Sequence, residues 1–282
     1  MSHPTRRDRA LACLLLVALV LVAFWTALTE VYGTSDDFSF YQRVLLDGLS
    51  CREILRAEGR PLLGVLYDAV GTAVSTFDDT RLFRAVFVVG ACLSALALCL
   101  FAATRLGVVA GAAAAALFVF SPAMLDLASL QPSSACTVAA AMVFAGYHGF
   151  VVARRSARRG PRLALYAAAA FALIASATIY QTACFVWFIC VAVELVTPAA
   201  GEATSARRPL LDTAASTGFF AAAMACYWVV FLQLLPRVTG VESAGRVELA
   251  TSIGAKAAWF VAMPLRAALV GPYFPAFDLQ AG

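Results

Sequence analysis

Long apolar segments separated by short polar ones dominate the hydropathy pattern of the chain. A helix needs about 20 mainly apolar residues to cross the hydrocarbon core of a bilayer. One run is long enough for two such helices, with a tight turn near residues 176–182. The pattern therefore predicts an all-α, polytopic membrane protein with about seven or eight transmembrane helices. The apolar runs are residues 10–28, 82–104, 108–120, 136–152, 163–196, 213–235 and 257–270.

Residues 30–79 form the longest polar interruption, and local signals within this loop predict short helices. The apolar periodicity of residues 40–49 predicts an amphipathic helix lying at the membrane interface. A second helix is expected to begin with the capping-box spacing of Ser50 and Glu53. Gly59 is suited to end that helix and the following Arg60-Pro61 pair to join it to the next. We expect the next element, residues 62–75, to be interfacial or re-entrant.

The composition agrees with a membrane protein and excludes some function classes. Hydrophobic residues make up 62% of the chain and charged residues 13%, and the mean hydropathy is +0.84. Soluble domains carry about 25% charged residues. The net charge of +4 is too small to indicate nucleic-acid binding. We therefore expect membrane lipid, and no nucleic acid, among the partners.

Arginine clusters between the apolar runs predict the topology. Arginine and lysine collect in the cytoplasmic loops of membrane proteins. Arginines at positions 6, 7 and 9 therefore place the N-terminus in the cytoplasm, and five arginines within residues 154–162 mark a later cytoplasmic loop. The loop at 30–79 and the turn near residues 176–182 then face the outside of the cell membrane.

The cysteines and the known short motifs give no sign of a metal, disulfide or phosphate-loop site. The eight cysteines lie mostly within apolar runs without a CxxC pair, which favours buried thiols, and Cys51 in the polar loop is expected to be a helix residue. No HExxH, GxSxG or phosphate-binding loop occurs, which argues against protease, lipase and ATPase classes. We predict no metal site and no cofactor, although an acidic pair has the chemistry to hold a divalent ion.

Two acidic pairs in the loop are candidates for proton transfer. An aspartate before a helix caps its free N–H groups and contributes about 0.5–2 kcal/mol. Alternatively, one carboxylate acts as a general base that removes a proton from an acceptor hydroxyl at the membrane surface. For Asp36 and Asp37 both roles stay open. Asp78 and Asp79 directly precede the second apolar run, so we interpret them as capping and ion-pairing residues.

Four further polar residues are candidates for substrate contacts, namely Arg43, Arg60, Tyr180 and Gln181. Arginine suits phosphate because its planar guanidinium presents a fork of donors. The neighbouring glycine and proline fix the backbone of Arg60, whereas a solvated face is the default for the other loop arginines. Tyr180 and Gln181 interrupt a long apolar run, which costs free energy unless they lie at a turn, an interface or a polar cavity.

Taken in order, several short motifs resemble the GT-C class of membrane glycosyltransferases, in particular the phage-type O-antigen glucosyltransferases of the serotype-conversion (Gtr) family. These motifs are a basic N-terminus before one span, SDDF at residues 35–38, GRPL at 59–62 and IYQT at 179–182. The resemblance implies a single GT-C-like transmembrane domain over residues 1–282, with its external loop at 30–79. Members of this class usually carry more spans, so we expect a short member or a chain truncated at its C-terminus.

The resemblance also implies an activity. In this family a hexose, with glucose as the favoured sugar, moves from a polyprenyl-phosphate-sugar donor to a cell-envelope glycan or lipid-linked acceptor at the external membrane face. Asp36 or Asp37 would be the catalytic acidic residue, and Arg60 would contact the lipid phosphate. Direct displacement would invert the anomeric carbon, with no nucleotide and no covalent enzyme intermediate.

Two other function classes are alternatives. A non-catalytic transporter or flippase for a lipid-linked sugar should carry charged residues along a substrate path within its spans. The central parts of the apolar runs are nearly free of charge, which favours the enzyme. A structural subunit whose external loop docks a partner is the third possibility.

Overall fold

Helices make up every regular element in the described part of the chain, as the all-α prediction requires. The structure, a computed structural model, describes residues 6–29, 42, 50–57, 59–76, 78–121, 124, 134–197 and 207–240. These residues all belong to one compact unit, Met1–Ser243, and the second unit, Ala244–Gly282, lies outside them. The amphipathic helix expected at residues 40–49 and the span expected at 257–270 therefore fall essentially outside the described residues.

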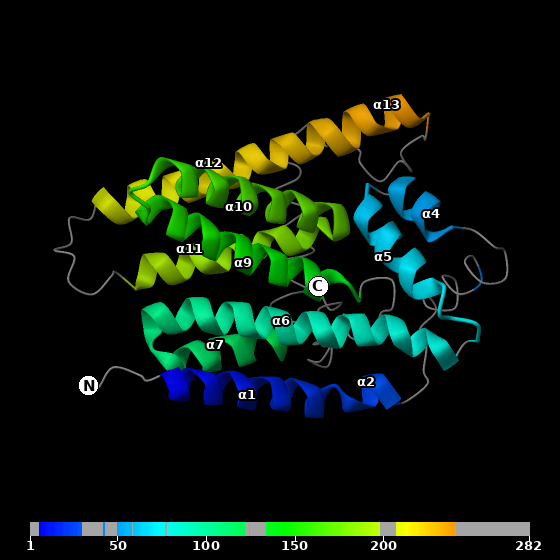
Figure 1. Cartoon of the computed structure of the whole chain (residues 1–282), viewed down its shortest axis with the longest axis horizontal. Helices are drawn as coiled ribbons and strands as arrows, with labels where there is room; N and C mark the ends of the chain where they lie inside the picture. The colour runs from blue at the N-terminus through cyan, green and yellow to red at the C-terminus, as the bar shows by residue number, and fades with distance from the viewer. Residues whose placement is uncertain are drawn as a thin grey trace, which may run out of the picture. The chain divides into compact units, whose positions relative to one another are not determined.

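The helices follow the predicted apolar runs closely (Figure 1). A 3₁₀ segment, η4, precedes α11, and a π-helical segment, η5, joins α12 to α13. The elements are α1 (Arg6–Ala23), α2 (Trp25–Thr29), α4 (Cys51–Ala57), α5 (Pro61–Gly71), η2 (Asp78–Thr80), α6 (Arg81–Leu106), α7 (Val108–Val119), α9 (Cys136–Arg155), α10 (Arg159–Ile179), η4 (Gln181–Val186), α11 (Trp187–Val196), α12 (Arg207–Tyr227), η5 (Trp228–Leu234) and α13 (Leu235–Thr239).

Four of the described helices are long and apolar enough to cross a membrane. They are α6, α9, α10 and the continuous rod Leu210–Thr239, which runs from α12 through α13. The predicted third span corresponds to α7, whose 12 residues reach only about 18 Å at 1.5 Å per residue, against a hydrocarbon core of about 30 Å. The segment Gln181–Val196 is apolar but also shorter than the four. The described helices thus support a membrane protein with four helices of spanning length, fewer than the seven or eight predicted.

Neighbouring helices pack through small and aromatic residues. Helix α6 contacts α7 and α9, α9 contacts α10, α1 contacts α6 and α7, and α10 contacts α12. A Cβ atom at Gly90 would overlap the Thr137 hydroxyl oxygen and crowd the Val138 backbone nitrogen, so only glycine permits the close approach of α6 to α9. Trp187 and Tyr147 are fully buried in the main core, with ring centroids 4.6 Å apart.

The outer faces of the helices, short α7 included, expose large apolar side chains. Val109, Leu117 and Phe171 are 85%, 76% and 71% exposed. In water such faces would be costly, since burial of apolar area stabilises a protein by roughly 25 cal/mol per Å². Contact with lipid accounts for them, in agreement with the membrane prediction.

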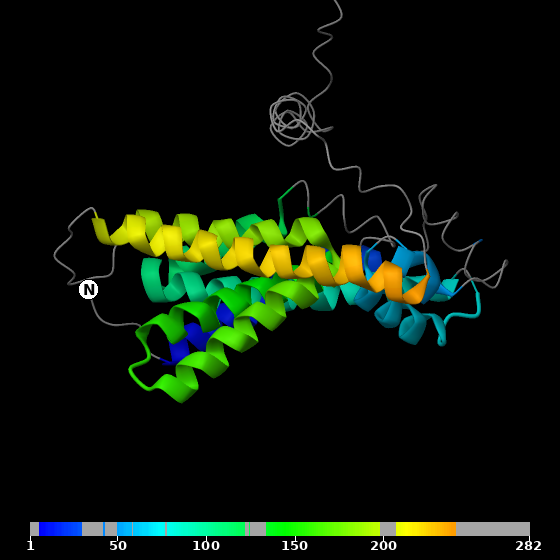
Figure 2. The same ribbon diagram turned by 90° about the horizontal axis from the view of Figure 1, so that it is seen from above.

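The two ends of the helix bundle differ in character. The turns α6–α7 and α9–α10 and the start of α1 lie at one end, and α4, α5 and α13 lie at the other (Figures 1 and 2). A second, smaller core holds α4 and α5 to the ends of α6, α9 and α10, centred on the fully buried Tyr67 and on Leu63 and Phe83. The first end carries the arginine-rich turns, and the second carries the candidate site described next.

The short helices of the polar loop begin and end near the predicted residues. Ser50 precedes α4, and its hydroxyl donates to the Asp68 carboxylate, which also accepts from the Arg52 backbone N–H at 3.1 Å. Cys51, the first residue of α4, is buried in the smaller core, and burial raises the pKa of its thiol to about 12. The thiol therefore stays protonated at neutral pH, as expected of a packed helix residue.

Candidate functional site

The joint between α4 and α5 holds Arg60 in a defined backbone conformation. Gly59 has a φ of 76°, its N–H donates to the Arg56 carbonyl at 3.0 Å, and the Arg60 N–H donates to the Leu55 carbonyl at 2.7 Å. This pair of bonds is the Schellman motif that commonly ends a helix at a left-handed glycine. Pro61 then begins α5, because a first helical position needs no N–H donor. The structure thus confirms the predicted joint, with Arg60 closing one helix and preceding the next.

An interruption of the helix at Tyr180 brings a second polar pair to the same end of the bundle. Helix α10 ends at Ile179, Tyr180 is extended with φ −154° and ψ 102°, and η4 begins at Gln181. This helix interruption lies within the turn predicted at residues 176–182. Helix α11 then returns along the bundle, so both polar side chains stay at the end that carries α4 and α5 (Figure 1).

Arg60, Tyr180 and Gln181, which were predicted separately, contact one another. The Arg60 Nε–H donates to Gln181 Oε1 at 3.3 Å, and the Arg60 guanidinium carbon lies 5.0 Å from the centroid of the Tyr180 ring. A guanidinium over an aromatic face gains about 0.5–2 kcal/mol, more where water is excluded. The hydrogen bond and the ring contact together orient a positive charge at this end of the bundle.

Tyr227, a residue that the sequence interpretation missed, completes this cluster. The Gln181 Nε2 group donates to the Tyr227 hydroxyl at 2.8 Å, and that hydroxyl donates to the Gly59 carbonyl at 2.8 Å. The Tyr227 side chain is buried, and its ring stacks on Phe231 at 5.7 Å. Its only sequence signal was a phenol in an apolar run, which is also ordinary at a membrane interface.

The last turn before the joint is closely covered by the helix that carries Tyr227. A Cβ atom at Gly59 would lie 2.6 Å from Leu232 Cδ2 and 3.4 Å from the Tyr227 hydroxyl oxygen. Glycine is therefore required at position 59 both by its positive φ and by this approach. Three segments distant in sequence meet here, at residues 59–60, 180–181 and 227–232, and we call this group the Arg60 cluster.

Three of the predicted site residues cannot be placed relative to this cluster. Asp36, Asp37 and Arg43 lie outside the described residues. Their proposed roles as catalytic carboxylates and as a substrate contact therefore stay predictions. Among the six candidates, the structure brings together Arg60, Tyr180 and Gln181.

Asp79 of the second acidic pair has the capping role that was predicted, whereas the predicted ion pairing of Asp78 and Asp79 is not found among the described residues. Asp79 Oδ2 accepts hydrogen bonds from the backbone N–H and the hydroxyl of both Ser75 and Thr76, at 2.9–3.1 Å. The backbone N–H of Ser75 and the hydroxyl of Thr76 are the main causes that lower the pKa of Asp79 to about 2. This carboxylate closes the turn before η2 and α6, and a group with so low a pKa is a poor general base at neutral pH.

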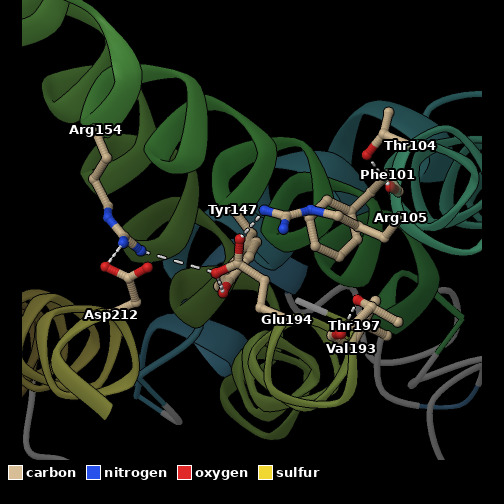
Figure 3. A network of polar contacts seen from close by, with 9 residues as sticks. All are labelled: Phe101, Thr104, Arg105, Tyr147, Arg154, Val193, Glu194, Thr197 and Asp212. Carbon is tan, nitrogen blue, oxygen red and sulfur yellow. Dashed lines mark hydrogen bonds and ion pairs between the residues drawn. The ribbon is translucent and has the colours of Figure 1, made fainter. Parts of the chain in front are cut away.

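A second polar group, also missed from sequence, lies at the arginine-rich end (Figure 3). Glu194 of α11 accepts from Arg105 of α6 at 2.5 Å and from the Tyr147 hydroxyl at 2.6 Å. Arg154 lies 3.9 Å from the same carboxylate and also pairs with Asp212 of α12. This Glu194 network joins four helices, and its signal in the sequence was a single carboxylate within an apolar run.

Metal ligation and similarity to known proteins add no further assignment. Within the described residues, no three His, Cys, Asp or Glu side chains are grouped so that they could hold a metal ion. No protein-family model, curated protein or solved structure matches the chain. The Arg60 cluster has the chemistry to bind an anion beside an aromatic ring and an amide.

Proposed function

We propose that the chain is a GT-C-type membrane glycosyltransferase that moves a hexose, with glucose favoured, from a polyprenyl-phosphate donor to a cell-envelope glycan or lipid-linked acceptor. The observation that carries this proposal is the direct contact between Arg60 and Gln181. These residues belong to the two motifs, GRPL and IYQT, on which the family resemblance depends. Their contact across the fold supports a shared site, because neither motif predicts the other by local sequence.

The proposed topology has seven or eight spans, with the N-terminus in the cytoplasm and the Arg60 cluster outside. The distribution of arginines supports it, since the α9–α10 turn and the start of α1 share the end of the bundle opposite the cluster (Figure 1). The four long helices supply half or more of the spans. The remaining ones would come from α1 with α2, α7, the segment Gln181–Val196 and residues 257–270.

The proposed reaction is a direct displacement at the anomeric carbon. Asp36 or Asp37 removes the proton from the acceptor hydroxyl, whose oxygen then bonds to the anomeric carbon. The bond between that carbon and the phosphate oxygen breaks, and polyprenyl phosphate leaves with the electron pair. Arg60 binds the phosphate and stabilises its growing negative charge, while Gln181 and Tyr180 hold the guanidinium in place.

The first test is the glycan composition of cells with and without the protein, followed by single substitutions. Asp36→Asn and Asp37→Asn keep the shape of the side chain and remove the base, so at least one should abolish glycan modification while the protein remains folded in the membrane. Asp78→Asn is the matched control, since Asp78 belongs to the pair at the start of η2. Full activity in both single variants would overturn the proposed catalytic role.

Sugar transfer by the purified protein in detergent separates the enzyme from a transporter or flippase, because a micelle has no second compartment. The charge distribution supports the enzyme. Charged residues in the long helices lie near their ends, such as Arg84 in α6, and the Glu194 network lies at the helix ends as well. A transport path would place such groups at the bilayer midplane. Absence of transfer from a supplied polyprenyl-phosphate-sugar, with a folded protein, would contradict the proposal.

A further inference from the structure

The α9–α10 turn presents four outward-facing arginines at the end of two long helices. Arg155 is the last residue of α9, Arg158 directly precedes α10, and Arg159 and Arg162 lie in its first turn. All four side chains are exposed. We call these four residues the basic turn.

The arginines that face into the bundle at the same end are matched by carboxylates. Arg105 and Glu194 are only 11% and 14% exposed, and Arg154 pairs with both Glu194 and Asp212 (Figure 3). Two arginines and two carboxylates therefore balance in the Glu194 network. This inner group is thus neutral without any contribution from the basic turn.

The basic turn has no such balance. Among the described residues, none of its four guanidinium groups pairs with a carboxylate. The sequence also contains no Asp or Glu between Asp126 and Glu194, so no neighbour along the chain offsets the charge. Four uncompensated positive charges within eight residues attract anions at the surface that they face.

The position of the basic turn indicates which anions these are. Helices α9 and α10 have 20 and 21 residues, the length of a membrane span, and only three residues separate them. The apolar side chains of Val152 and Leu163, on either side of the turn, are 41% and 56% exposed. An arginine beside such a lipid-facing side chain lies at the depth of the headgroups.

We propose that the basic turn binds the phosphates of anionic phospholipid headgroups in the leaflet at this end of the bundle. The binding is separate from the proposed sugar transfer, which takes place at the opposite end. It rests on charge complementarity, on exposure of the four guanidinium groups and on their place at the ends of two spans. A juxtamembrane arginine near an anionic surface strengthens lipid attraction about fivefold, the equivalent of about 1 kcal/mol.

The test uses the whole chain in vesicles of phosphatidylcholine with trace spin-labelled phosphatidylglycerol or spin-labelled phosphatidylcholine. The measurement is the ratio of the association constants of the two labelled lipids for the protein surface. We expect a preference for phosphatidylglycerol that weakens with added salt. The double variant R155Q/R159Q should lower the ratio by about tenfold or more, and R155K/R159K should retain it because the charge is kept.

The matched control is R81Q/R237Q, which removes two exposed arginines from α6 and α13 without touching the basic turn. It should lower the preference less than R155Q/R159Q does, because Arg81 and Arg237 belong to separate helices and are not part of a cluster. An unchanged ratio in R155Q/R159Q, or an equal fall in the control, would overturn the proposal. Inorganic phosphate at the same concentration as the anionic lipid should not compete, and if it removes the preference, the site takes free phosphate rather than a headgroup. Circular dichroism should give the same helix content for all variants, since the substituted side chains are exposed.

Discussion

The Arg60 Nε–H donates a hydrogen bond to Gln181 Oε1 across 121 positions of sequence. This bond connects the joint of two short helices, α4 and α5, to the interruption between the long helix α10 and the shorter segment Gln181–Val196. The same glutamine uses its Nε2 group on the Tyr227 hydroxyl, so one side chain orients both the guanidinium and the phenol. Gln181 is therefore the central residue of the Arg60 cluster.

Gln181→Leu should remove both bonds while keeping much of the volume of the side chain. The Arg60 Nε–H loses its acceptor and the Tyr227 hydroxyl loses a donor, which costs about 1–3 kcal/mol when such groups are part-buried. We expect a lower midpoint of thermal unfolding in detergent and, under the proposed function, a rise in KM for the lipid-phosphate donor. The neighbouring Thr182 is exposed, so Thr182→Ala should change neither quantity.

Tyr227→Phe tests the buried hydroxyl alone, since the ring and its stacking on Phe231 remain. The buried Gly59 carbonyl would then keep only the longer contact of 3.5 Å from Gln181 Nε2. We expect a loss of about 1–2 kcal/mol in the free energy of unfolding. Tyr166→Phe is the control, because Tyr166 makes ring contacts in the same protein. An equal effect of both substitutions would show that the Tyr227 hydroxyl has no special role.

These residues show which parts of the site the sequence could predict. The joint at Arg60 was predictable because its signals, a glycine and a proline on either side, are local. The cap role of Asp79 was predictable for the same reason. Tyr227 and Glu194 were missed because their partners lie 168 and 89 residues away, at Gly59 and Arg105. Only four of the seven or eight predicted spans are helices of spanning length among the described residues, because hydropathy alone does not fix where a helix begins and ends.

Gly59→Ala should destabilise the joint for two separable reasons. An alanine at φ 76° costs about 1–2 kcal/mol, and its Cβ would lie 2.6 Å from Leu232 Cδ2. Adding Leu232→Ala should relieve the overlap and recover part of the loss, but not the part due to φ. Gly71→Ala is the control, because a Cβ at Gly71 meets nothing within 4 Å. Thermal unfolding of the wild type and these three variants in one detergent measures each contribution.

Asp79→Ala should weaken the start of α6 in a way that depends on pH. Because the pKa of Asp79 is lowered to about 2, its contribution to stability is fully present above the ordinary aspartate pKa and is lost as pH falls through the folded value. The difference in unfolding midpoint between wild type and Asp79→Ala should therefore be constant near neutral pH. It should shrink between about pH 4 and about pH 2. A difference that is unchanged over this range would contradict the role of the charged carboxylate.

Glu194→Ala should be the most damaging single substitution in the Glu194 network. It leaves Arg105, only 11% exposed, without its carboxylate, and removes the acceptor of the Tyr147 hydroxyl (Figure 3). Breaking a buried pair by removing one partner costs up to about 3–5 kcal/mol. Asp212→Ala is the matched comparison, because Asp212 is 44% exposed and an exposed pair contributes no more than about 1 kcal/mol. Unfolding midpoints in detergent should fall in the order wild type, Asp212→Ala, Glu194→Ala. Equal midpoints for the two variants would mean that Arg105 finds another partner or water, and that the network does not hold α6 to α11.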